Sequence, residues 1–212
     1  MNESITGAPR EFRHIVLLVV FHFVFCWIAS RFYPEPFVPF HHAVSDFGAS
    51  LTHDLALQNP VSPYFYSAGL LLSAIWMLLM PATFDRGYRH RNLITHACSL
   101  GAVGFAMMVA PHDLPYTRPV HVTGSAFLFL ALWLMTMVYL YRCRERGHHG
   151  LFWTGVIILH VTILSYAVFF AVDSPAKQAA QAVSIIGLLI PLLSGSYVAT
   201  HDGLARPVEP IS

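Results

Sequence analysis

The chain has few charged side chains. Only 11% of its 212 residues are charged, whereas soluble globular proteins average about 25%. Because a soluble domain of this size needs far more polar surface, the composition excludes one. The formal net charge is +1 and no cluster of Lys and Arg is interleaved with aromatics, so we set aside nucleic-acid binding.

Cysteine is also scarce, with three residues and no CxxC motif. Cys26 and Cys98 lie inside apolar stretches, and Cys143 lies in a basic segment. None of the three falls in a segment that we expect outside the membrane, so no disulfide framework is indicated. We interpret all three as small buried hydrophobic residues.

Long apolar stretches, in contrast, fill most of the chain, and 56% of its residues are hydrophobic. A helix needs about 20 apolar residues to cross the hydrocarbon core of a bilayer, and six stretches reach or approach that length. The sequence therefore predicts an all-α fold, a polytopic bundle of six transmembrane helices in a single transmembrane domain over residues 1–212. The expected helices cover about residues 14–31, 63–84, 92–112, 119–141, 150–172 and 178–200.

The first stretch has an alternative interpretation, because its basic flank and its Ala29-Ser30 end are also typical of a signal peptide. Cleavage there would leave five spans with the same loop orientation. We expect a retained helix and six spans.

Basic residues in the short loops predict the orientation, because cytoplasmic loops are enriched in Lys and Arg. If the N-terminus is inside, the outer segments contain only Arg31, Arg118 and Lys177. The inner segments then contain Arg10, Arg13, Arg86, Arg89, Arg91, Arg142, Arg144, Arg146 and Arg206. We therefore expect both termini in the cytoplasm, a long first extracytoplasmic loop over residues 31–62, and a multi-pass protein of the plasma (bacterial inner) membrane.

Polar side chains gather on the predicted outer side. They are Glu35, His41, His42, Ser45, Asp46, His53, Asp54, His112, Asp113, His121 and Asp173. A short turn brings the end of the third helix to the start of the fourth, so we expect His112, Asp113 and His121 to converge there with Asp46. Imidazoles and carboxylates together suit a divalent metal such as zinc.

The same side chains also suit catalysis. Ser45 is a candidate nucleophile, His121 a candidate base, and Asp46 or Asp113 the aspartate that would orient it. Helix ends and loops are, however, where polar residues ordinarily lie, and Asp often caps a helix. No spacing matches a recognised metal signature, so a purely structural role for these residues is the alternative interpretation.

Three histidines lie at membrane depth, where ionisable residues are functional candidates. They are His22, His96 and His160, in the first, third and fifth expected helices. Paired histidines could ligate a b-type haem, but these three lie at unequal depths. Neutral histidines bonded to neighbouring helices are the favoured interpretation, with haem as the alternative cofactor.

Two segments resemble a known family. The stretch Ala43-Val-Ser-Asp-Phe-Gly-Ala49, followed by Pro63-Tyr-Phe-Tyr-Ser-Ala-Gly69, is similar to the domain-of-unknown-function family 998 of six-helix membrane proteins. The similarity extends to Ala110-Pro-His-Asp113 and His121, and a more distant likeness is to the Frag/DRAM-like proteins. Phe47 stands where the pattern usually has Leu. The resemblance implies architecture rather than activity, and it favours Ser45, Asp46, Gly48, Asp113 and His121 over the other outer polar residues.

Three functions follow from these observations. The first is a membrane protein that binds or modifies a lipid or lipid-linked headgroup at a Ser/Asp/His site on the outer side. The second is a non-catalytic subunit or scaffold that works with other membrane subunits. The third is a haem or quinone redox protein that uses the intramembrane histidines.

Overall fold

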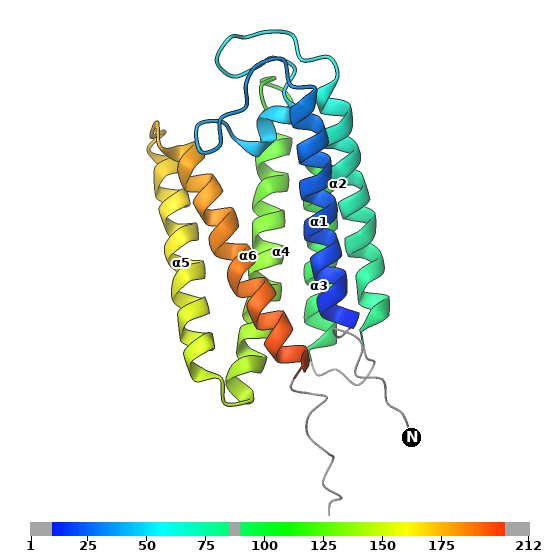
Figure 1. Cartoon of the computed structure of the whole chain (residues 1–212), viewed down its shortest axis with the longest axis vertical. Coiled ribbons are helices and arrows are strands. Elements are labelled where there is room, and N and C mark those ends of the chain that lie inside the picture. The colour runs from blue at the N-terminus through cyan, green and yellow to red at the C-terminus, as the bar shows by residue number, and fades with distance from the viewer. Residues whose placement is uncertain (1–9, 85–89, 202–212) are drawn as a thin grey trace, which may run out of the picture.

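The computed structural model describes residues 10–84 and 90–201, and within these ranges every regular element is a helix. The six α-helices are α1 (Arg10–Arg31), α2 (Ser62–Leu79), α3 (Arg91–Met107), α4 (Arg118–Glu145), α5 (His149–Ala171) and α6 (Lys177–His201). Two short 3-10 helices are η1 (Val44–Gly48) and η2 (Met80–Thr83), the second continuing α2. The helices run up and down in chain order along one long axis (Figure 1).

Five of the helices are long and apolar enough to cross a membrane. They are α1, α2 with η2, α4, α5 and α6. Their outward faces expose large apolar side chains such as Trp27, Leu78, Ile157 and Leu164. Soluble proteins rarely expose so much contiguous apolar surface, so the fold is consistent with an integral, multi-pass membrane protein.

Helix α3 is shorter than the sequence predicted. It ends at Met107, five residues before the expected boundary at residue 112, and its 17 residues span about 26 Å. Pro111 contributes to the early end, because its nitrogen has no hydrogen to donate to the Met107 carbonyl four residues earlier, and its ring disfavours helical geometry at Ala110. The segment after Met107 is instead a turn that leads directly into α4.

The helices pack in a ring, with α5 on its outside. Helix α1 packs on α2, α2 on α3, α3 on α4 and α4 on α6, and a sparser contact between α6 and α1 completes the ring. Helix α5 packs against α4 and α6, and buries Phe152, Gly155 and Leu159. The sparse contact between α1 and α6 leaves room for the pocket described below.

The two ends of the bundle differ in charge and structure. The loop end holds residues 32–61, 108–117 and 172–176, and its neighbouring basic residues are Arg31, Arg118 and Lys177. The opposite end holds Arg10, Arg13, Arg91, Arg142, Arg144 and Arg146, and an ion pair of 3.1 Å from Arg142 to Glu11 joins α4 to α1 there. Arg86, Arg89 and Arg206, which also entered the orientation argument, lie outside the described residues.

Candidate functional site at the loop end

The loop of residues 32–61 is packed onto the bundle. Tyr33 and Phe47 are buried and contact each other edge to face. Asn59 donates a hydrogen bond of 2.9 Å to the Ala49 carbonyl, and Ser62 donates one of 2.9 Å to the Phe47 carbonyl. These buried bonds tie η1 and its flanks to the start of α2, so the polar side chains of η1 lie in a defined position.

Asp113 fastens this loop to the turn between α3 and α4. Its Oδ2 accepts hydrogen bonds from the Ser50 hydroxyl at 2.5 Å, the Ser50 amide at 2.9 Å and the Leu51 amide at 3.1 Å. Burial raises the pKa of this carboxyl, but these hydrogen bonds lower it more, so its pKa lies below the ordinary value. The structure therefore gives Asp113 a loop-holding position, while Asp46, His112 and His121 come together beside it.

Asp46, His112 and His121 form the first polar group, which we name the Asp46 cluster. His112 Nε2 lies 3.3 Å from Asp46 Oδ1, and the rings of His112 and His121 are 5.3 Å apart. The other carboxylate oxygen of Asp46 accepts the Ala43 amide at 2.8 Å. A carboxylate that orients an imidazole is suited to general acid–base chemistry.

The two imidazoles of this cluster differ in their hydrogen bonding. His121 Nδ1 lies 2.8 Å from the Ala110 carbonyl and must donate to it, whereas His112 Nδ1 is buried without a hydrogen-bond partner. An unpartnered buried nitrogen is costly, so His112 has a free acceptor or donor to offer a ligand. Within the described residues, Ser45 forms no hydrogen bond to His112 or His121, and its catalytic role stays a prediction.

Ser45 instead lines an apolar pocket that extends from η1 into the bundle. The pocket lies between α1, α4 and α6 and has a cavity volume of about 110 Å³. Apolar side chains such as Leu128, Ile185 and Leu188 form most of its wall. Its polar residues are His22, Ser45, Ser125 and Gln181.

The polar lining connects the pocket to the Asp46 cluster. Ser45 precedes Asp46 in η1, and the Ser125 hydroxyl donates 3.1 Å to the His121 carbonyl one turn earlier in α4. His22, on the α1 wall, contacts Phe105 of α3, and its Nδ1 is buried without a hydrogen-bond partner. The pocket thus combines a long apolar wall with polar groups at the loop end.

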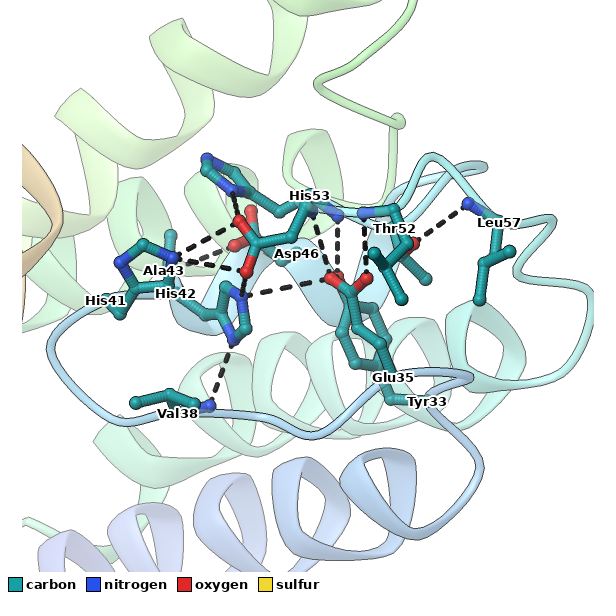
Figure 2. A network of polar contacts seen from close by, with 12 residues as sticks. Tyr33, Glu35, Val38, His41, His42, Ala43, Asp46, Thr52, His53 and Leu57 are labelled. Atoms are coloured by element: carbon teal, nitrogen blue, oxygen red, sulfur yellow. Dashed lines mark hydrogen bonds and ion pairs between the residues drawn. The ribbon is translucent and has the colours of Figure 1, made fainter.

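A second polar group, which we name the Asp54 cluster, lies in the same loop. It consists of His41, His42, His53 and Asp54, whose ligand atoms all lie within 4.8 Å of one another (Figure 2). Among residues 10–84 and 90–201, this is the set of His, Cys, Asp and Glu side chains whose geometry could hold a metal. The three imidazoles, His53 first, hold the pKa of the Asp54 carboxyl well below its usual range.

Backbone hydrogen bonds fold the loop so that these residues meet. Thr52 and Leu57 close a turn, with the Thr52 amide 2.9 Å from the Leu57 carbonyl and the Leu57 amide 2.9 Å from the Thr52 hydroxyl. The buried Glu35 carboxylate then accepts the amides of Asp54 at 3.1 Å and Leu55 at 3.0 Å (Figure 2). Glu35 therefore brings the tip of the turn back to the start of the loop.

Burial and hydrogen bonding shift the pKa values of the Tyr33 and Glu35 side chains. Burial raises the pKa of the Tyr33 hydroxyl to about 12, so it stays neutral, accepts the His53 amide at 3.1 Å and donates to Glu35 at 3.4 Å. Burial also raises the pKa of Glu35, but hydrogen bonds from Asp54, Thr52 and Leu55 lower it more, and the net pKa is below the ordinary value. Glu35 is therefore a buried carboxylate that hydrogen bonds keep ionised.

The Asp54 cluster was not selected from the sequence, although its residues were among the outer polar side chains. The available signal was two adjacent ligand pairs, His41-His42 and His53-Asp54, within one proline-containing loop. No spacing rule indicates that such pairs meet, because the turn between residues 52 and 57 and the Glu35 contacts decide it.

The histidines at membrane depth lie apart. His160 Nδ1 is 2.8 Å from the Val156 carbonyl and its Nε2 accepts the Trp133 indole at 3.4 Å, so both ring nitrogens are bonded within the α4–α5 pair. His22 contacts Phe105, and His96 is exposed on α3. This geometry favours the structural interpretation of His160 and brings no two of them together as a haem-ligating pair.

Comparisons with known proteins identify no family for this chain. No protein-family model, curated protein or solved structure matches the chain, so its resemblance to family 998 stays a prediction from short motifs.

Proposed function

We propose that this protein binds a lipid, with the lipid chain in the pocket between α1, α4 and α6 and the headgroup at Ser45 and the Asp46 cluster. The observation that carries the proposal is the apolar pocket with Ser45 at its loop end. A ligand with one apolar and one polar part fits such a lining.

The polar end is what would make the binding selective. Lipid tails are as apolar as leucine, so a chain gains little by leaving the bilayer for an apolar pocket. Discrimination must therefore come from hydrogen bonds and charge at the headgroup. Ser45, the partnerless His112 Nδ1 and the Asp46 carboxylate supply a hydroxyl, an imidazole and an anion for this purpose.

The membrane arrangement belongs to the same proposal. All six helices cross the bilayer, α3 as a short span, both termini are cytoplasmic, and the loop end is extracytoplasmic in the plasma membrane. Two observations support this: the packing of α3 between α2 and α4, and the six basic residues at the opposite end against three near the loop end. The lipid would then bind from the outer leaflet.

A chemical step on the headgroup is a further part of the hypothesis. The Asp46–His112 pair has the geometry of an oriented base, and Ser45 is the neighbouring hydroxyl. The competing function is a non-catalytic membrane subunit, in which the same residues only position the loop. The role of Asp113 as a loop clamp fits both functions.

A substitution that fills the pocket tests lipid binding. Ile185→Trp, on the pocket wall of α6, should reduce the lipid retained by detergent-purified protein by about tenfold, because the added ring occupies the chain's space. The measurement is native mass spectrometry, or extraction followed by lipid analysis. The matched control is Ile186→Trp, the next residue, which is 48% exposed on the outside of α6 and should retain lipid as the unchanged protein does.

A second variant separates headgroup recognition from chain binding. Asp46→Asn removes the charge beside His112 without filling the pocket, and should change which lipid classes are retained rather than the total amount. Equal lipid retention by Ile185→Trp, Ile186→Trp and the unchanged protein would refute the pocket, and an unchanged lipid profile in Asp46→Asn would refute the headgroup site.

A further inference from the structure

The nitrogens of three imidazoles surround the Asp54 carboxylate at ligand-like spacing. His41 Nε2 lies 3.2 Å from both Asp54 oxygens, His42 Nε2 lies 3.0 Å from Oδ2, and His53 Nδ1 lies 3.0 Å from Oδ1. In a tetrahedral zinc site with bonds of about 2.0–2.1 Å, neighbouring ligand atoms are about 3.3 Å apart. The distances from the three nitrogens to the carboxylate oxygens are close to that spacing, and all four ligand atoms lie within 4.8 Å of one another.

Hydrogen bonds on the far side of each ring indicate which nitrogens are free to bind an ion. His42 Nδ1 accepts the Val38 amide at 3.0 Å, so the ring proton of neutral His42 is on Nε2, facing Asp54 Oδ2 (Figure 2). To bind a metal through Nε2, His42 would have to move that proton to Nδ1 and lose the Val38 bond. His42 is thus suited to hold the carboxylate rather than the ion.

His41 and His53 carry no such restriction. The far nitrogen of His53 lies 3.5 Å from the Gln178 side-chain amide, which can turn to present its oxygen when that nitrogen carries the proton. His41 is 57% exposed, His53 39% and Asp54 44%, whereas His42 is 1% exposed. The three accessible side chains leave a path for an ion, and the buried one lies behind them.

We propose that His41, His53 and Asp54 bind a divalent transition-metal ion, with zinc the expected ion and His42 a positioning residue. Two imidazoles and one carboxylate suit zinc or a related ion better than magnesium or calcium, which prefer oxygen ligands alone. His42 donates from Nε2 to Oδ2, leaving Oδ1 for the ion, and a metal-bound carboxylate is ordinarily oriented by such a bond. The fourth position is open to water or another ligand.

The structure around the site holds it in this shape. Phe40, directly before His41, has φ of 68°, and Ala56, two residues after Asp54, has φ of 49°. Left-handed backbone costs free energy in residues other than glycine, and the surrounding contacts must compensate for it. Here Glu35 holds the Asp54 and Leu55 amides, and His41 and His42 donate their amides to the Val38 carbonyl. The bound ion would fasten the loop at the point where Gln178 of α6 meets His53.

Metal titration of the full-length protein in detergent tests this site. After chelator treatment, the protein should bind one Zn²⁺ with a dissociation constant below about 10 µM, measured by competition with a chromophoric chelator. His53→Ala and Asp54→Asn should each weaken binding by at least about tenfold. His96→Ala, an exposed histidine on α3, is the matched control and should leave the affinity unchanged.

Cobalt distinguishes the ligands from the positioning residue. Co²⁺ bound in place of Zn²⁺ should absorb in the visible range, and the His53→Ala variant should change that spectrum because a ligand is lost. His42→Gln should weaken Co²⁺ binding while leaving the spectrum of the bound form unchanged. A changed spectrum in His42→Gln would show that His42 is a ligand and overturn its assignment.

One measurement uses the unchanged protein and needs no substitution. Zn²⁺ should protect His41 and His53 of the unchanged protein from acylation by diethylpyrocarbonate, mapped by peptide mass spectrometry, while His149, exposed at the opposite end, stays reactive. Absence of protection, or of Zn²⁺ binding, would overturn the proposal. Zinc binding that is lost in His112→Ala but kept in His53→Ala would also overturn it, by moving the ion to the Asp46 cluster. Lipid retention is measured separately, so failure here leaves the lipid proposal standing.

Discussion

At the scale of single residues, the donors around each carboxylate decide what it does. Asp46 lies beside His112, Asp54 is surrounded by three imidazoles, and Asp113 accepts the hydroxyl and amides of Ser50 and Leu51. These aspartates all lie at the loop end, yet one faces His112, one a cluster of histidines and one a loop backbone. Backbone donors favour a holding role for Asp113.

Replacement of Asp113 should loosen the loop. In Asp113→Asn, a neutral side chain replaces a charged acceptor of three hydrogen bonds. Because Asp113 is exposed and solvent screens its charge, we expect a loss of about 1 kcal/mol, below the range of about 1.5–3 kcal/mol for charged hydrogen bonds. Thermal unfolding in detergent should show a decrease in Tm of about 2–4 °C at neutral pH.

The pH dependence of that difference has a defined sign. The folded-state pKa of Asp113 is lowered, so its contribution is fully present above the unfolded value of about 3.9 and is lost as the pH falls through the folded value. The gap in Tm between the unchanged protein and Asp113→Asn should therefore shrink below about pH 4. A gap that stays constant down to the lowest pH would contradict this explanation.

The sequence indicated part of this site and missed part for a physical reason. Asp46, His112 and His121 were expected together because a short turn joins two helix ends, and short turns restrict geometry strongly. Asp113 was grouped with them, but its side chain turns to the loop amides, whose position the sequence does not define. His41, His42, His53 and Asp54 meet only because Glu35 and the Thr52–Leu57 turn fold the loop back.

At the scale of the helices, α3 and α4 approach more closely than their neighbours do. A Cβ on Gly104 would lie 2.7 Å from the Gly124 carbonyl and 2.7 Å from the Leu128 amide, and one on Gly124 would lie 2.8 Å from the Gly104 carbonyl. Both contacts are with backbone, which cannot move aside as a flexible side chain can. This close packing places the turn with His112 directly beside His121 at the start of α4.

Gly104→Ala should therefore destabilise the bundle. The added methyl group forces α3 and α4 apart, and overpacking of this kind costs about 1–3 kcal/mol. Gly150→Ala is the matched control, since a Cβ there has nothing within 4 Å, and its effect should stay within about 0.5 kcal/mol. Denaturant or thermal unfolding in detergent measures both, and equal effects of the two substitutions would refute the close approach.

The sequence predicts the presence of the helices better than it predicts where they end. The apolar stretches indicated all six helices, because their length and composition carry the signal directly. The end of α3 was placed too late, since hydropathy continues through Val109 and Ala110 while the helix ends earlier, before Pro111. The order of packing, with α5 outside the ring, depends on which apolar faces fit together, which hydropathy does not encode.

At the scale of the whole molecule, both proposals depend on which side of the membrane the loop end faces. The distribution of basic residues favours a cytoplasmic position for the opposite end, and the two polar clusters and Ser45 of the pocket lie at the loop end. An extracytoplasmic metal site takes up its ion from a different supply than a cytoplasmic one, and a pocket that opens there takes lipid from the outer leaflet. The orientation therefore determines which ions reach the metal site and which lipids reach the pocket.

Single exposed cysteines test that orientation. Tyr116→Cys places a thiol at the loop end, at a position 76% exposed, and His149→Cys places one at the opposite end. A membrane-impermeant maleimide should label Tyr116→Cys in sealed right-side-out vesicles, and should label His149→Cys only after the membrane is opened. Cys26, Cys98 and Cys143 are buried, so the unchanged protein provides the background. The reverse pattern would invert the orientation and place both sites in the cytoplasm. Labelling of both positions from outside would mean that α4, the helix between them, does not cross the bilayer.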